Sequence, residues 1–158
     1  GCKDSVKIPV VTTGGIADGR TMAAALVLGA QGVMMATRFV ATKECTVHDN
    51  IKQELIRRQE NDTTLIMKSM GLQGRAIKNE VVKKVLELES KGAGLGDLVP
   101  LLSGNRVKEA WETGNADIAP MMMGQSVGLV KDVPTCKELL VRMAKEAKEE
   151  IDRIARLF

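Results

Sequence analysis

Two segments near the start of the chain carry residues suited to binding an anion. The first, Gly14-Gly15-Ile16-Ala17-Asp18-Gly19-Arg20-Thr21, follows a β-branched apolar run and precedes a run of small apolar residues. This order predicts a strand, a glycine turn and a helix. Glycine lets the backbone approach an anion closely, and the N–H groups at a helix start favour negative charge. The segment therefore predicts a phosphate-binding turn.

A second segment repeats the pattern a short distance along the chain. Gly32-Val33-Met34-Met35-Ala36-Thr37-Arg38-Phe39 predicts another short buried strand that ends in a polar turn. Two adjacent strand ends could hold one phosphate between them. We expect the phosphate to meet backbone N–H groups of both turns, with the Thr37 hydroxyl as a further donor. The residues assigned to this site are Gly14, Gly15, Met35, Ala36 and Thr37.

The first turn also comes close to the loop that binds nucleoside triphosphates. Gly14, Gly19 and Thr21 occupy positions required by the motif G-x-x-x-x-G-K-[ST], but Arg20 replaces its lysine. Arginine is a poor substitute for the lysine point charge between terminal phosphates. The next strand ends in Met35-Ala36-Thr37 and offers no aspartate for magnesium. The sequence therefore argues against a triphosphate-binding loop.

The two turns and one later segment resemble the nitronate monooxygenase family, formerly called 2-nitropropane dioxygenases. This family includes flavin-dependent enoyl-acyl-carrier-protein reductases. The matching segments are Gly14 to Arg20, Met35 to Phe39, and Met123-Gly124-Gln125-Ser126-Val127-Gly128-Leu129. Ala36 departs from the glycine that the family usually has there, which retains the backbone N–H but adds a methyl group.

The resemblance implies an α/β fold that forms the C-terminal portion of an FMN-binding (β/α)8 TIM barrel with a small helical inserted domain. Phosphate sites in such barrels commonly lie on the loops after strands seven and eight. Residues 1–42 would hold these two strands and the FMN phosphate site, residues 43–117 a small, mainly helical, substrate-side region, and residues 118–158 the return to the barrel and its last outer helix.

A barrel of this type takes about 250 residues, so 158 residues beginning at the seventh strand would be an incomplete C-terminal fragment. The resemblance then implies that the family's histidine base lies upstream of Gly1, and no catalytic residue is assigned within this chain. His48, the sole histidine, lies on an expected helix and is interpreted as a surface or interface residue.

By resemblance, the protein would be an FMN-dependent oxidoreductase, in the first instance a nitronate monooxygenase that oxidises alkyl nitronates with oxygen. One alternative is an FMN-dependent enoyl-acyl-carrier-protein reductase of fatty-acid synthesis. Others are a catalytically inactive fragment and another phosphate-binding barrel, such as a relative of inosine-monophosphate dehydrogenase. Core packing is the default interpretation of Met121 to Met123. The resemblance implies the alternative that Met123, Gln125 and Ser126 border the flavin or substrate. NAD(P)H is a candidate reductant, and we expect a homo-oligomer or association with the N-terminal part.

Composition narrows the classes of partner. A net charge of +3, with two Phe, one Trp and no Tyr, gives little support for nucleic-acid binding. The absence of a long apolar run argues against a membrane span. Cys2, Cys45 and Cys136 are isolated and odd in number, which favours a reducing cytoplasm and argues against a metal site.

Overall fold

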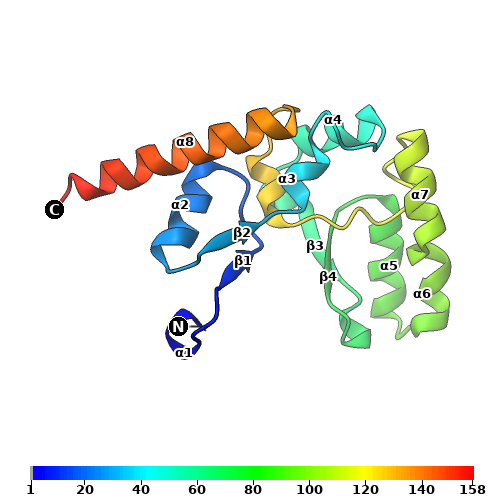
Figure 1. The fold of residues 1–158 in the computed structure, drawn as a ribbon. Coiled ribbons are helices and arrows are strands. Elements are labelled where there is room, and N and C mark those ends of the chain that lie inside the picture. Colours follow the sequence, from blue (N-terminus) through cyan, green and yellow to red (C-terminus); the bar gives the residue numbers. More distant parts are fainter. Residues whose placement is uncertain (1) are drawn as a thin grey trace. The chain divides into compact units, whose positions relative to one another are not determined.

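The computed structural model describes residues 2–158, with side-chain surroundings from Asp4 onward. The chain forms two compact units, one made of residues 1–45 and 132–158 and the other of residues 46–131. Residues 118–131 therefore group with the second unit. The first unit contains α1 (Cys2–Ser5), β1 (Val11–Thr13), α2 (Gly19–Val27), β2 (Gly32–Met34), α3 (Thr37–Val40) and α8 (Cys136–Ala155) (Figure 1).

The first unit is built on a pair of parallel strands. Strands β1 and β2 pair so that Thr12 lies opposite Val33 and Thr13 opposite Met34. Val33 packs against a cluster of buried side chains contributed by the turn after β1, by α2 and by α8, namely Ile16, Ala25, Leu139 and Met143. Val11 and Met34 are both 60% exposed, so the described residues cover only one face of this small sheet.

Helix α8 begins where the sequence indicates. Thr135 accepts a hydrogen bond from the backbone N–H of Glu138, and the Glu138 carboxylate accepts one from the backbone N–H of Thr135, which forms a capping box. The buried stripe contains Leu139, Met143 and Ala147. The spacing of apolar residues predicts a buried stripe that runs from Leu140 through Met143 and Ala147 to Phe158. Met143 and Ala147 are buried as predicted, but Leu139 takes the place of Leu140, which is 52% exposed. The end of the stripe at Phe158 is exposed in the described chain. Helix α2 has nine residues and α8 has twenty, so α2 covers only part of its length.

The second unit combines short helices with a β-hairpin. Its elements are α4 (Asp49–Arg57), η1 (Glu60–Asp62), β3 (Thr63–Ile66), η2 (Lys68–Met70), β4 (Gly74–Ile77), α5 (Glu80–Ser90), α6 (Leu95–Leu102), α7 (Gly104–Thr113) and η3 (Gln125–Leu129). Strands β3 and β4 are antiparallel, and the core contains Ile66, Ala76, Val82, Val85 and Leu98. Within the described residues, no helix is both long and apolar enough to cross a membrane.

The methionine segment lies beside this hairpin. The backbone N–H of Ile77 donates to the Met121 carbonyl, and that of Met123 donates to the Arg75 carbonyl. Residues 121–123 therefore add to the free edge of β4. The buried side chain of Asn79 caps α5 by accepting from the Val82 N–H. The second unit therefore contains more strand structure than the mainly helical region predicted from the sequence.

Candidate functional site

The parallel pairing brings the two predicted turns to the same edge of the sheet. Because Thr13 lies opposite Met34, the chain leaves β1 into Gly14 and Gly15 beside the point where it leaves β2 into Met35. Gly14 and Gly15 have φ angles of +88° and +77°, in the left-handed region that favours glycine. A Cβ atom built on either residue would meet no heavy atom within 4 Å. The backbone of this turn therefore borders open space.

The start of α2 differs from the sequence interpretation. The N–H of Gly19 donates to the Glu146 carboxylate at 3.0 Å, and the N–H of Thr21 donates to the Asp18 carboxylate at 2.8 Å. A phosphate at this helix start would meet two carboxylates that already hold N–H groups. The helix start is therefore occupied by the protein's own acidic side chains, and the glycine turn before it is the better anion-binding element.

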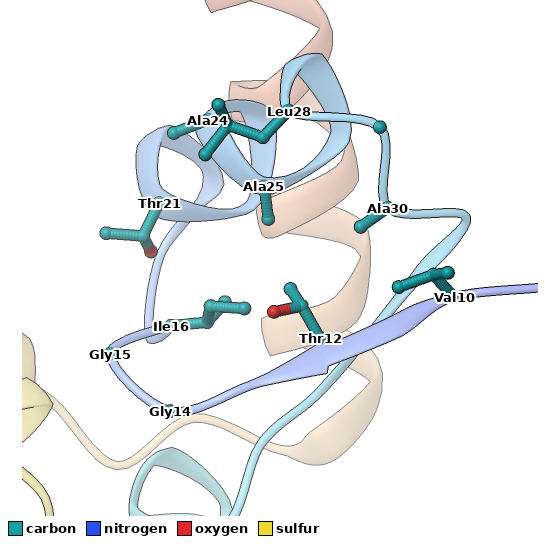
Figure 2. Close-up of a pocket in the computed structure, with 11 residues that line it drawn as sticks. Val10, Thr12, Gly14, Gly15, Ile16, Thr21, Ala24, Ala25, Leu28 and Ala30 are labelled. Carbon is teal, nitrogen blue, oxygen red and sulfur yellow. The ribbon is translucent and has the colours of Figure 1, made fainter. Parts of the chain in front are cut away.

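A pocket of about 400 Å³ lies beside the glycine turn, between β1 and α2. Figure 2 shows Thr12 and Ile16 lying between the strand and the helix, with Ala25 on the helix side that faces them. The lining residues are Val10, Thr12, Gly14, Gly15, Ile16, Thr21, Ala24, Ala25, Leu28, Gly29 and Ala30. This lining contains no lysine or arginine, so an anion at the turn would be held there by backbone N–H groups.

The second turn leads into the four-residue helix α3. Ala36 is exposed and precedes α3, and its carbonyl accepts hydrogen bonds from the N–H groups of Phe39 and Val40. Thr37, the first residue of α3, is 8% exposed. The structure thus places the five predicted residues on two adjoining strand ends, with both glycines and Ala36 exposed at the surface of the described chain.

Arg38 follows this turn and is directed into the protein. Its side chain is 3% exposed, and its Nη2 lies 2.6 Å from Asp132 Oδ1. Burial lowers the pKa of Arg38, and the neighbouring Asp132 carboxylate opposes that shift. The sequence alone gives no sign of this ion pair, because Arg38 and Asp132 are 94 positions apart.

The predicted substrate-side residues lie in the second unit and differ in exposure. Met123 and Ser126 are buried, at 4% and 7% exposure, whereas Gln125 is exposed. Met122, between the buried Met121 and Met123, is 48% exposed. Within this unit, Gln125 is therefore the predicted residue whose side chain is accessible to a ligand.

His48 occupies a structural position in the second unit. It is the N-cap residue of α4, where its Nδ1 accepts a hydrogen bond from the Asn50 N–H at 3.1 Å. Its backbone N–H donates to the Trp111 carbonyl, and its ring lies against Gly114. The described residues contain no group of three histidine, cysteine, aspartate or glutamate side chains placed to hold a metal ion.

Comparison with known proteins identifies the family of the chain. The sequence model of the family described as nitronate monooxygenase matches residues 2–146. The chain belongs to the nitronate monooxygenase family. It is 34% identical to a probable nitronate monooxygenase of Staphylococcus saprophyticus, over 95% of this chain and 42% of that protein. The solved structure of FabK from Thermotoga maritima superposes with a TM-score of 0.92 at 33% identity, covering 99% of this chain and 49% of FabK.

A third relative is named for a different oxidoreductase activity. The chain is 32% identical to (3aS,4S,5R,7aS)-5-hydroxy-7a-methyl-1-oxo-octahydro-1H-indene-4-carboxyl-CoA dehydrogenase of Rhodococcus jostii, over 98% of this chain and 54% of that enzyme. The chain thus spans about half the length of the relatives it matches. These relatives are oxidoreductases, and the α/β arrangement of the chain is consistent with their family fold.

Proposed function

We propose that the full-length protein is an FMN-dependent oxidoreductase, in the first instance a nitronate monooxygenase, and that this chain binds the phosphate of FMN. Gly14, Gly15, Met35, Ala36 and Thr37 form the proposed phosphate site. The family's flavoenzymes support FMN as the cofactor. The observation that carries the proposal is the parallel register that brings both turns to one edge of the sheet.

The local backbone fits a phosphate group. Both glycines have positive φ, and the position that a Cβ would take on each is open. A phosphate oxygen can approach such a backbone closely, and successive N–H groups in a turn form a concave site for an anion. The backbone N–H of the exposed Ala36 would complete the clamp from the neighbouring strand end.

The residues of this chain then bind and orient the cofactor. FMN, when bound, supplies the electron transfer between the two half-reactions. The clamp fixes the phosphate end of FMN and so limits the positions that the rest of the molecule can take. Gln125 is the proposed contact with the flavin or substrate, and the buried Met123 and Ser126 hold the segment that carries it. His48 already serves as a helix cap, so we do not propose it as the catalytic base.

Substitution of Gly15 tests the phosphate site. In the full-length protein, Gly15→Val should place a branched side chain in the open space of the turn and abolish most FMN binding. Gly92→Val is the matched control, because Gly92 also has positive φ (+81°) with no heavy atom within 4 Å of an added Cβ. Both variants carry similar backbone strain, so a difference in their FMN dissociation constants, measured by flavin fluorescence titration, reports whether the substituted glycine lies at the phosphate site. Wild-type FMN affinity in Gly15→Val would contradict the assignment.

Enoyl-acyl-carrier-protein reduction is the second candidate function, and the likeness to FabK favours it. A nitronate monooxygenase should consume oxygen with propyl nitronate and need no nicotinamide. An enoyl reductase should oxidise NAD(P)H only when an enoyl thioester is supplied. Parallel oxygen-electrode and absorbance assays on the purified full-length protein separate the two activities. We further propose a cytoplasmic homo-oligomer, which light scattering and cell fractionation would test.

A further inference from the structure

We propose that Asp132 is a positioning residue for the FMN phosphate, acting through Arg38 to hold the turn formed by Met35, Ala36 and Thr37. This inference rests on the proposed FMN site. An arginine next to a phosphate-binding turn suggests a direct phosphate ligand from sequence alone. The geometry points to a different role, in which Arg38 binds the protein and the backbone of the turn binds the phosphate.

The guanidinium of Arg38 bridges two separate parts of the first unit. Its Nη1 donates to the Ala41 carbonyl at 3.2 Å and to the Asp132 carbonyl at 3.3 Å. Its Nη2 donates to Asp132 Oδ1 at 2.6 Å. One side chain therefore fixes the end of α3 and connects it to the segment that precedes α8.

Asp132 is held in turn by a second arginine. Arg142, on α8, donates from Nη1 to Asp132 Oδ2 at 2.6 Å and from Nη2 to Oδ1 at 3.1 Å. This paired arrangement fixes the carboxylate more firmly than a single contact would. The hydrogen bonds from Arg142, followed by the charges of both arginines, lower the pKa of Asp132 despite its partial burial. The carboxylate thus remains charged and shared between α3 and α8.

Helix α3 needs such support. It has only four residues, and Ala36 at its N-cap provides no side-chain hydrogen bond. Helices of this length are not stable by themselves. Two further contacts strengthen the same connection, since the Lys43 N–H donates to the Pro134 carbonyl and the Cys136 N–H donates to the Glu44 carboxylate. The position of the proposed phosphate turn therefore depends on its attachment to the start of α8.

Loss of the Asp132 charge separates a positioning role from direct binding. In the full-length protein, Asp132→Asn leaves a side chain of the same shape but deprives buried Arg38 of its counter-charge. If Arg38 positions the turn, the FMN dissociation constant should rise roughly tenfold or more, by analogy with the loss of metal affinity when a residue that orients a metal ligand is removed. Riboflavin, which lacks the phosphate, should bind with little change. Flavin fluorescence titration measures both constants on the apoprotein.

Two further variants complete the experiment. The double variant Arg38→Met/Asp132→Asn should have about the same FMN dissociation constant as the single variant that binds FMN more weakly, because both substitutions remove the same contact. Arg153→Met is the control, since it removes only the surface pair with Glu150 on the same helix. Thermal melting of each apoprotein identifies general unfolding. If Arg38→Met does not fold, Asp132→Asn still decides the question, because Asp132 is only partly buried.

Four results would overturn the inference. Tighter FMN binding in Asp132→Asn would indicate that the released Arg38 is itself a phosphate ligand. Unchanged FMN binding would show that the contact between Asp132 and Arg38 does not position the turn. Equal weakening of FMN and riboflavin would indicate a general structural role, as would weakening explained by an unfolded apoprotein. Failure of the proposed function is recognised separately: the wild-type protein would bind no FMN, or Gly15→Val would bind it normally. If Gly15→Val loses FMN and Asp132→Asn keeps it, only the positioning role fails.

Discussion

Gly19 should be intolerant of even one added carbon. It is the first residue of α2, and a Cβ built on it would lie 2.2 Å from Glu146 Cβ and 2.7 Å from the Ala147 backbone nitrogen. Carbon atoms pack best at about 3.5–4.0 Å, so the overlap with Glu146 exceeds about 1 Å. The Ala147 nitrogen is a backbone atom and cannot rotate away, so α2 and α8 must separate.

We expect Gly19→Ala to lower the free energy of unfolding by about 1–3 kcal/mol, the usual cost of overpacking a well-packed contact. Alanine also favours helices over glycine by up to about 1 kcal/mol, which would reduce the net effect. Gly104→Ala is the matched control: Gly104 is the first residue of α7, and an added Cβ there meets nothing within 4 Å. It should be neutral or slightly stabilising.

Urea denaturation of the full-length protein and both variants measures this difference. Gly19→Ala should also weaken FMN binding, because the N–H of Gly19 donates to Glu146 within the same contact and α2 follows directly from the glycine turn. A Gly19→Ala protein as stable as the wild type would refute the packing argument. Equal destabilisation by Gly104→Ala would refute it too, since the effect would then reflect the loss of any helix-start glycine.

Three other outcomes are expected. His48→Ala should cost about 1 kcal/mol of stability through loss of the α4 cap, with kcat unchanged; a large fall in kcat without loss of stability would contradict its structural role. Asp132 has a lowered pKa in the folded protein, so its stabilisation is present above about pH 3.9, the ordinary value for an unfolded aspartate, and is lost as the pH falls through the folded value. Melting temperatures of wild type and Asp132→Asn should therefore converge in acid, and a constant difference would refute this. The 158-residue chain alone should self-associate, because Val11, Met34 and Leu157 expose apolar surface. It should also lack turnover, because no catalytic residue is assigned within it. A monodisperse monomer by light scattering, or turnover in an activity assay, would refute the corresponding expectation.

Local signals in the sequence predict the helix ends well. Thr135 with Glu138 predicts a capping box, Asn79 predicts the start of α5, and Gly114 predicts the end of α7, all of which the structure confirms. Each signal depends on hydrogen bonds between residues only a few positions apart. Such contacts are nearly independent of the rest of the fold, so they can be recognised in a single sequence.

The missed features depend on contacts distant in sequence. Strand β4 is Gly74-Arg75-Ala76-Ile77, which lacks a clear alternation of apolar and polar residues. It forms a strand because β3 pairs with one edge and residues 121–123 with the other. Residues 139 and 140 are both leucine, so the sequence spacing alone does not distinguish them, and only the crossing with α2 selects Leu139 for the buried stripe of α8.

The glycines of the first turn show most clearly what sequence spacing leaves open. Gly14, Gly15 and Gly19 form one motif by spacing, and all three suit close approach of a phosphate. In the structure, Gly14 and Gly15 have positive φ and border open space, whereas Gly19 is helical and touches α8. The first two are free to approach a ligand, and the third lets two helices approach each other. Because glycine serves both purposes for the same reason, the absence of a Cβ, only the three-dimensional surroundings distinguish a binding glycine from a packing glycine.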